Sequence, residues 1–280
     1  MMRCLIAFVV VVFAASSQAQ QRVVSINMCA DQLLLLLSPP ENIVSVSYLS
    51  ADPQYSDWTE EAVKYPLNYA KAEEIVTMRP DLVLAGQYSD PMVIRLLVQQ
   101  NIPVYQLTRP QKLEHLFDET LAVGEKLNQS ARAAVLVSEW RQNIDLLRAR
   151  GSTGKKPRMA IIGPNGFTQG AGSLRDQMLQ KAGIINVAAQ LDMTGNSEFT
   201  LEQIITQQPD LIALEDSTEN HNSLAQRLLD HPAIKNLTSS RVSLPANLWS
   251  CSGPSYVKAL QALIDAKLAW QSKQGKYSES

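Results

Sequence analysis

Hydrophobic positions along the 280-residue chain form two alternating patterns. Short apolar runs beside Gly, Pro or Asp indicate buried strands, and longer segments with apolar residues at helical spacing indicate covering helices. Strands are predicted at residues 23–26, 43–46, 82–85, 104–107, 159–162, 211–214 and 242–244. Helices are predicted at residues 30–37, 92–100, 113–127, 130–150, 224–229 and 255–270, and from residue 173. Strands alternating with helices in this way indicate parallel sheets covered on both faces.

One phrase of this pattern occurs twice, as AEEIVTMRPDLVLA at residues 72–85 and as LEQIITQQPDLIAL at residues 201–214. Each copy predicts a short helix, a Pro that stops it, an Asp and a buried strand. Thr200 and Gln203 form a capping box at the second copy. The copies are too far apart for a solenoid, whose units run to roughly 20–50 residues. They indicate two similar α/β lobes with a ligand cleft between them.

Residues 130–150 contain no Gly or Pro and predict one long helix between the lobes. Its apolar residues recur at helical spacing, at Ala133, Val137, Trp140, Ile144 and Leu147. A helix of this length spans roughly 30 Å, the width of a small domain. The predicted fold is therefore two parallel-sheet α/β lobes joined by one stiff helix. Its parts are an N-terminal lobe at residues 20–128, a joining helix at 129–151 and a C-terminal lobe at 152–280.

The first nineteen residues predict an export signal. Arg3 precedes an apolar stretch at residues 5–15, and Ser17-Gln18-Ala19 is a small-residue cleavage site. The stretch is about half of the roughly 20 residues needed to cross a bilayer. We therefore expect a soluble periplasmic protein that starts near Gln20. Removal of Arg3 leaves 24 basic and 27 acidic side chains, a balance that argues against nucleic acid or an anionic membrane as partner.

Two cysteines remain after the signal, and each follows a predicted strand and precedes a helix. Loops at this place in parallel sheets form the ligand crevice. Cys29 and Cys251 can form a disulfide, remain two free thiols, or bind a soft metal as paired thiolates. A disulfide would close a loop of about 220 residues and stabilise the fold by roughly 5 kcal/mol.

Catalytic motifs are lacking. The three histidines have no metal-ligand spacing, and no G-x-S-x-G motif occurs, so we expect neither an enzyme nor a resident metal. The Gly-rich stretch at residues 163–173 matches neither the dinucleotide fingerprint nor the P-loop and is interpreted as a cleft-lining loop. The irregular segment at residues 48–69 carries five aromatic rings, which either cover the core or line the cleft. Glu73 and Glu202 open the repeated helices, where acids either complement the helix dipole or dock on a basic partner.

Several of these segments together carry a resemblance to a known family. In chain order they are VVSIN at 23–27, the two PDL repeats, the Gly-rich loop at 166–173, AG at 182–183, NVA at 186–188, HP at 231–232, RV at 241–242 and SGP at 252–254. In this order and spacing the chain resembles periplasmic solute-binding proteins of the helical-backbone class, which serve ABC importers for ferric siderophores, haem and cobalamin. The resemblance implies two lobes that close little on binding and a ligand held between them. It implies no cofactor, because the ligand is itself the cargo.

The resemblance also implies residue roles. Glu73 and Glu202 match the acids that dock on arginines of the inner-membrane permease dimer. The positions that match family ligand contacts are Asn27, Met28, Cys29, Tyr48, Tyr55, Trp58, Phe167, Trp249 and Cys251. No arginine stands out among Arg95, Arg109 and Arg175, so the expected cargo is a neutral or weakly charged iron chelate or a corrinoid, carried by a monomer. The alternatives are a receptor for a bare transition-metal ion that uses the cysteine pair, and a redox or metallocluster protein of similar lobe design.

Overall fold

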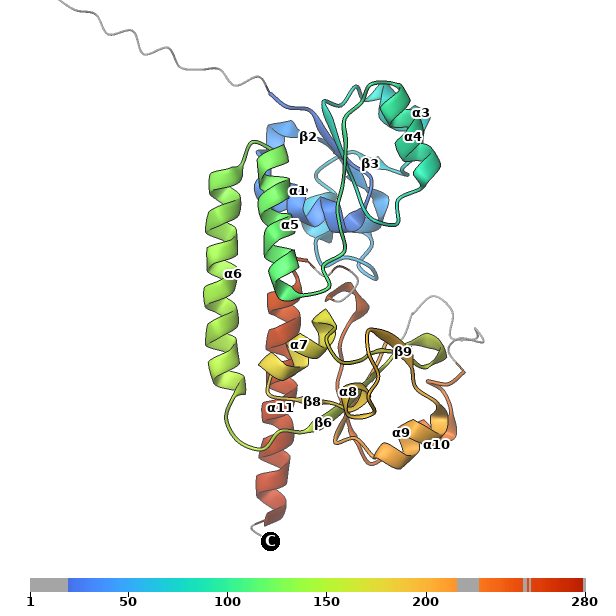
Figure 1. The fold of residues 1–280 in the computed structure, drawn as a ribbon, viewed down its shortest axis with the longest axis vertical. Coiled ribbons are helices and arrows are strands. Elements are labelled where there is room, and N and C mark those ends of the chain that lie inside the picture. The colour runs from blue at the N-terminus through green and yellow to red at the C-terminus, as the bar shows by residue number, and fades with distance from the viewer. Residues whose placement is uncertain (1–19, 216–226, 249–250, 252, 279–280) are drawn as a thin grey trace, which may run out of the picture.

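The computed structural model describes residues 20–215, 227–248, 251 and 253–278. The predicted signal at residues 1–19, Trp249 and residues 224–226 of the helix predicted at 224–229 lie outside these ranges, and residues 227–229 form a turn instead of that helix. Figure 1 shows two lobes, one above the other, with long helices along one side. No helix in the described ranges has both the length and the apolar character needed to cross a membrane.

The N-terminal lobe contains a five-stranded parallel sheet in the order β3-β2-β1-β4-β5. Its strands are β1 Val23–Ser25, β2 Ile43–Ser47, β3 Leu67–Asn68, β4 Leu82–Ala85 and β5 Val104–Gln106. Its helices are α1 Met28–Leu37, η1 Pro40–Asn42, η2 Tyr48–Ala51, α2 Thr59–Ala62, α3 Ala72–Thr77, α4 Pro91–Gln99 and α5 Leu113–Lys126. The hydrophobic pattern misses β3 because two residues are too few to show a period.

The C-terminal lobe contains a four-stranded parallel sheet in the order β11-β10-β6-β8 and an antiparallel pair, β7 with β9. Its strands are β6 Arg158–Ile162, β7 Phe167–Gln169, β8 Ile185–Asn186, β9 Asn196–Glu198, β10 Leu211–Leu214 and β11 Ser240–Arg241. Its helices are η3 Pro164–Gly166, α7 Leu174–Lys181, α8 Val187–Gln190, α9 Leu201–Gln207, α10 Pro232–Lys235 and η5 Ala246–Leu248. The capping box of Thr200 and Gln203 on α9 is confirmed.

The prediction of a strand at residues 242–244 was wrong, because the strand here is β11, Ser240–Arg241. The paired residues are Ser240 and Arg241, and only one further ladder bond follows, from the Val242 N–H to the Ile212 carbonyl. Pro245 comes soon after, and proline has no N–H to donate to a sheet. The apolar residues 242–244 therefore lie just beyond a strand whose paired residues are polar.

The joining helix is α6, Ser130–Gly151, and it buries Ala133, Val137, Trp140 and Ile144 as its spacing predicts. A second long helix, α11 Tyr256–Ser278, packs along it, so two rods rather than one support the lobes (Figure 1). One hydrophobic cluster runs through both lobes between these helices and includes Phe117, Met178 and Leu263. Fully buried Lys267 of α11 donates from Nζ to the Gly151 carbonyl at the end of α6, and burial lowers the pKa of this ammonium group. The lobes thus share a core along α6 and α11.

Asp31 is a buried acid beneath the aromatic segment. It lies on α1 with none of its surface exposed, and its Oδ2 accepts from the Ser47 N–H at 3.0 Å and the Ser50 hydroxyl at 2.6 Å. These bonds tie η2, which begins at Tyr48, to α1. Burial raises the pKa of the Asp31 carboxyl from 3.8 to about 7, although the hydrogen bonds oppose the rise.

This pKa predicts that Asp31 destabilises the fold at alkaline pH. A raised acid pKa means that the folded state holds the proton more tightly than the unfolded state does. The stabilisation that protonated Asp31 gives the fold is therefore fully present below about pH 3.8 and is lost as the pH rises through about 7. The difference corresponds to on the order of 4 kcal/mol. Asp31→Asn keeps an oxygen acceptor for both donors. We expect its urea stability to match the wild type near pH 4 and to exceed it above pH 8, whereas exposed Asp145→Asn changes neither. An unchanged pH profile in Asp31→Asn would contradict this.

Candidate functional site

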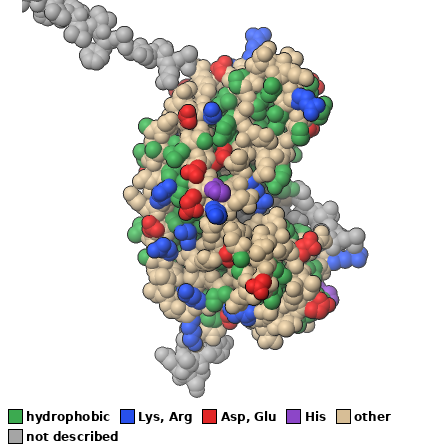
Figure 2. Space-filling view, viewed as in Figure 1, with side chains coloured by type: hydrophobic (Ala, Val, Ile, Leu, Met, Phe, Trp, Pro, Cys, Tyr) green, Lys and Arg blue, Asp and Glu red, His purple; other side chains and the backbone are tan. Residues whose placement is uncertain are grey.

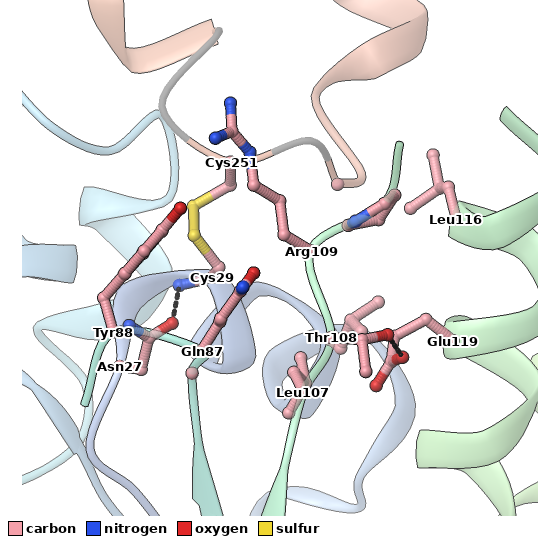
Figure 3. A pocket seen from close by; sticks show the side chains of 14 residues that line it. Asn27, Cys29, Gln87, Tyr88, Leu107, Thr108, Arg109, Leu116, Glu119 and Cys251 are labelled. Carbon is pink, nitrogen blue, oxygen red and sulfur yellow. Dashed lines mark hydrogen bonds between the residues drawn. A yellow bond between two sulfur atoms is a disulfide. The ribbon is translucent and has the colours of Figure 1, made fainter. Parts of the chain in front are cut away.

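A cavity of about 280 Å³ lies at the carboxyl edge of the N-terminal sheet, beside the loop before α11. Its residues follow β1, β4 and β5 or belong to α1, α5 and the segment ahead of α11 (Figure 3). Its lining consists of Asn27, Cys29, Leu33, Gly86, Gln87, Tyr88, Leu107, Thr108, Arg109, Pro110, Leu116, Glu119, Cys251 and Gly253. Figure 2 shows the surface hollowed between the two lobes on the side away from α6. The wall of the site therefore combines the N-terminal lobe with the segment between η5 and α11, which supplies Cys251 and Gly253.

Asn27 connects the end of β1 to the start of α1. Its Oδ1 accepts from the N–H groups of Cys29 at 3.0 Å and Ala30 at 3.4 Å, so it caps the helix and orients Cys29. Its amide packs on Gly86, where a Cβ would lie only 2.4 Å from Asn27 Cγ. The absence of a side chain at Gly86 thus allows this wall of the cavity to form.

The packing of Gly86 on Asn27 can be tested by substitution. Gly86→Ala is expected to displace the Asn27 side chain, cost about 1–2 kcal/mol of stability and deform the cavity. Asn27→Ala removes the same cap without a clash and is expected to cost about 1 kcal/mol. The double variant should cost less than the two single losses combined, because the added methyl then meets no amide. Additive losses in urea denaturation would show that the two residues are not in contact.

Cys29 and Cys251 are joined by a disulfide across a sequence separation of 222 residues. The sequence was compatible with a disulfide, with two free thiols or with a metal-bound thiolate pair, and the structure contains the disulfide. Both cysteines line the cavity. The bond engages both sulfurs that a receptor for a bare transition-metal ion would use as thiolates. Within the described ranges, no group of three or more His, Cys, Asp or Glu side chains is arranged to hold a metal ion.

The cavity lining contains one carboxyl group, that of Glu119, and one guanidinium group, that of Arg109. The carboxyl group accepts hydrogen bonds from two neighbouring hydroxyls. Glu119, 7% exposed, accepts from the Tyr105 hydroxyl at 3.1 Å and from the Thr108 hydroxyl. Burial, together with the Glu119 charge, raises the pKa of Tyr105 to about 12.

Arg109 also lines a smaller cavity of about 30 Å³ with Arg175, and it forms no ion pair with any residue that the structure describes. Figure 3 shows Arg109 extended toward the loop of Cys251. The Arg109 guanidinium therefore has no carboxylate partner among the described residues, whereas the Glu119 carboxylate already accepts two hydrogen bonds.

Three of the predicted ligand residues, Asn27, Cys29 and Cys251, come together in this cavity. The other described ones do not line it; they are Met28, Tyr48, Tyr55, Trp58 and Phe167. Tyr48 stacks on Tyr69 with 4.8 Å between ring centroids and is 42% exposed. Trp58 precedes α2, with Lys258 Nζ 5.6 Å from its ring centroid. Phe167 begins β7 in the opposite lobe.

Sequence reasoning missed the residues that follow β4 and β5. These are Gly86, Gln87 and Tyr88 after β4, and Thr108, Arg109 and Pro110 after β5. The signal for them is the rule that ligands bind at the carboxyl ends of parallel strands, applied to every strand rather than to the first and last. By sequence Arg109 is only one of three candidate arginines, and the structure places it in the cavity wall.

The profile of the periplasmic binding protein family matches residues 23–241. The chain belongs to this family. The resemblance drawn from the sequence is thereby confirmed.

Curated relatives and solved structures agree with this assignment. The chain is 24% identical over 255 residues to the cobalamin-binding protein of Halobacterium salinarum, covering 88% of this chain and 69% of that protein. It is similar in fold to the periplasmic heme-binding protein RhuT from Roseiflexus sp. RS-1, with a TM-score of 0.70, 22% identity and coverage of 89% and 99% of the two chains. It is similar also to the periplasmic vitamin B12-binding protein BtuF of Vibrio cholerae, with a TM-score of 0.65, 17% identity and coverage of 90% and 98%. The predicted two-lobe α/β fold is confirmed.

Proposed function

We propose that this protein is the substrate-binding component of an ABC importer, which captures an iron complex or a corrinoid between its lobes and delivers it to a membrane permease. The observation that carries the proposal is the cavity at the carboxyl edge of the N-terminal sheet, closed by Cys251 and Gly253 of the segment that leads from the C-terminal lobe to α11. The names of the relatives support the cargo class, since they are cobalamin-, heme- and vitamin B12-binding proteins. The role is binding and delivery without catalysis.

The lining is suited to a partly apolar ligand. Leu33, Leu107 and Leu116 supply apolar surface, and the amide of Gln87 and the guanidinium of Arg109 supply donors. The volume lies near the lower end of the 300–1,000 Å³ typical of ligand pockets, so a large chelate would extend beyond it. Tyr88 is 77% exposed beside the cavity and is available to pack on the protruding part. We assign the same role to Met28, Tyr48, Tyr55, Trp58, Phe167 and Trp249.

Delivery requires a docking surface on each lobe. Glu73 and Glu202 lie in the first turns of α3 and α9, the two copies of the repeat, and Glu73 is exposed. Hydrogen bonds from its own backbone N–H and from Thr200 lower the pKa of the Glu202 carboxyl. We propose that this matched pair contacts arginines of a permease dimer in the inner membrane. The protein would act in the periplasm as a monomer after removal of residues 1–19.

A binding assay tests the proposed function. Protein purified from an exporting host is titrated with haemin, ferric citrate and cyanocobalamin while tryptophan fluorescence is followed, and bound iron and cobalt are measured separately. We expect saturable binding of at least one probe. Arg109→Gln should weaken binding of the anionic chelates about tenfold or more, whereas Arg132→Gln on the exposed face of α6 should not. No saturable binding and no bound metal would reject the cargo class.

A further inference from the structure

The two lobes are linked covalently at two separate places. One is α6, which together with α11 borders the shared hydrophobic core. The other is the Cys29–Cys251 disulfide, which lines the ligand cavity itself. It joins the first turn of α1 to the segment just ahead of α11. The lobes are thus joined by packing along α6 and α11, and by one covalent bond at the cavity.

Three polar contacts beside the disulfide join residues that the structure describes. Asp57 accepts from the Ser255 hydroxyl at 2.7 Å and from Lys258 Nζ at 2.8 Å. The Asn247 amide donates to the Pro53 carbonyl at 3.1 Å. The Lys258 side chain is 59% exposed, and ion pairs in contact with water contribute little. The start of α11 is also held, because Lys258 lies over the Trp58 ring and Tyr256, Ala259 and Leu260 pack in the shared core. The short stretch of Cys251 and Gly253 ahead of α11 lies outside that core cluster.

Beneath the disulfide, the seam between the lobes contains buried polar groups that are not satisfied. The Gln32 side chain is fully buried on α1, and neither its oxygen nor its nitrogen bonds to any group in the described structure. A Cβ on Gly253 would lie 3.2 Å from Gln32 Oε1, so the amide faces the segment that carries Cys251. The hydroxyl of Tyr256, a residue that is 2% exposed, likewise has no hydrogen-bond partner in the described structure. Burial of such groups without partners opposes closure of the seam.

We propose that the Cys29–Cys251 disulfide is a latch on the ligand cavity. When oxidised, it holds Cys251 and Gly253 against α1 although the polar groups beneath them oppose contact, and it thereby completes the cavity wall. Reduction by a dithiol breaks the S–S bond, forms two cysteine S–H groups with the two electrons and two protons supplied, and converts the dithiol into its own disulfide. The wall is then free to move away, and ligand affinity falls. This proposal rests on the proposed function.

The latch makes a quantitative and reciprocal prediction. If the closed arrangement falls to about one tenth of the reduced population, the apparent Kd rises about tenfold. Linkage then requires the bound ligand to shift the reduction equilibrium of the disulfide by the same factor. A disulfide that only stabilised the fold would raise the melting temperature and leave the Kd of the folded protein unchanged.

The test compares four samples: the oxidised wild type, the Cys29→Ser/Cys251→Ser double variant, the reduced wild type and the reoxidised wild type. The wild type is reduced with dithiothreitol, which is then removed under nitrogen before binding is measured. Part of this reduced protein is afterwards reoxidised and measured again. Near-UV circular dichroism establishes that each sample is folded, and haemin and cyanocobalamin are the probes. We expect about tenfold weaker binding in the variant and in the reduced protein, with recovery on reoxidation. Equal Kd values in folded samples would overturn the latch. Should the variant not fold, the reduced wild type decides the outcome.

A readout without ligand separates this proposal from the proposed function. Hydrogen–deuterium exchange at residues 27–33 and 253–258 should rise at least tenfold on reduction, while exchange in the middle of α6 stays constant. If no probe binds the oxidised protein, the proposed function fails, and the exchange result still decides on the latch. Unchanged exchange in both segments overturns the latch even where a probe binds.

Discussion

Replacing Cys29 and Cys251 together by serine is expected to lower the free energy of unfolding by about 3–5 kcal/mol. The bond joins residues 222 positions apart, so it confines most of the chain in the unfolded state. In the chain-entropy description, a loop of this length corresponds to roughly 5 kcal/mol. The cost is largest for long loops because the free chain gains the most conformations when the loop is opened.

Urea denaturation of oxidised wild type and of the double variant measures this loss. The dependence of the free energy on urea should also steepen in the variant, since an unlinked unfolded chain exposes more surface. Asp57→Asn is a matched control in the same seam, because it weakens the contacts with Ser255 and Lys258 and leaves the disulfide intact. It should cost only about 1 kcal/mol. A loss no larger than that of the control would contradict the expected contribution of the disulfide.

Reversing the charge of both glutamates proposed to dock on the permease, Glu73→Arg with Glu202→Arg, is expected to abolish import while ligand binding stays unchanged. The two residues occupy the same position in the two copies of the repeat, and α3 and α9 lie at opposite ends of the molecule (Figure 1). A partner that contacts both ends at once gains from two weak sites, because the second contact forms within the same complex. Either single reversal should therefore reduce import strongly but incompletely, and like charges facing the permease make reversal more harmful than neutralisation.

Uptake of the bound ligand by cells that express the cognate permease measures this effect. Glu139→Arg, on the exposed face of α6, is the matched control and should import normally. The purified double variant must bind the probe with wild-type Kd, which excludes a general loss of folding. Normal import by the double variant would remove both glutamates from the docking surface.

Local patterns determined the elements and the family of this protein. The apolar runs placed β1, β2, β4 and β6, and the capping box placed the start of α9. The absence of Gly and Pro over residues 130–150 placed α6. Strand propensity, capping and helical period act between neighbours in the chain, so the sequence records them directly. The repeat then indicated two lobes, because similar local patterns fold into similar units.

Only the tertiary structure decided how distant segments meet. Sheet order β3-β2-β1-β4-β5 brings the ends of β4 and β5 beside Asn27, which places Tyr88 and Arg109 in the cavity. The pairing of Cys29 with Cys251, and the burial of Lys267 at the end of α6, depend on how the two lobes pack. Such contacts join residues with no local relation in the chain. They are set by burial of the shared core and by the way α6 and α11 pack on each other, and that packing joins segments more than 100 residues apart.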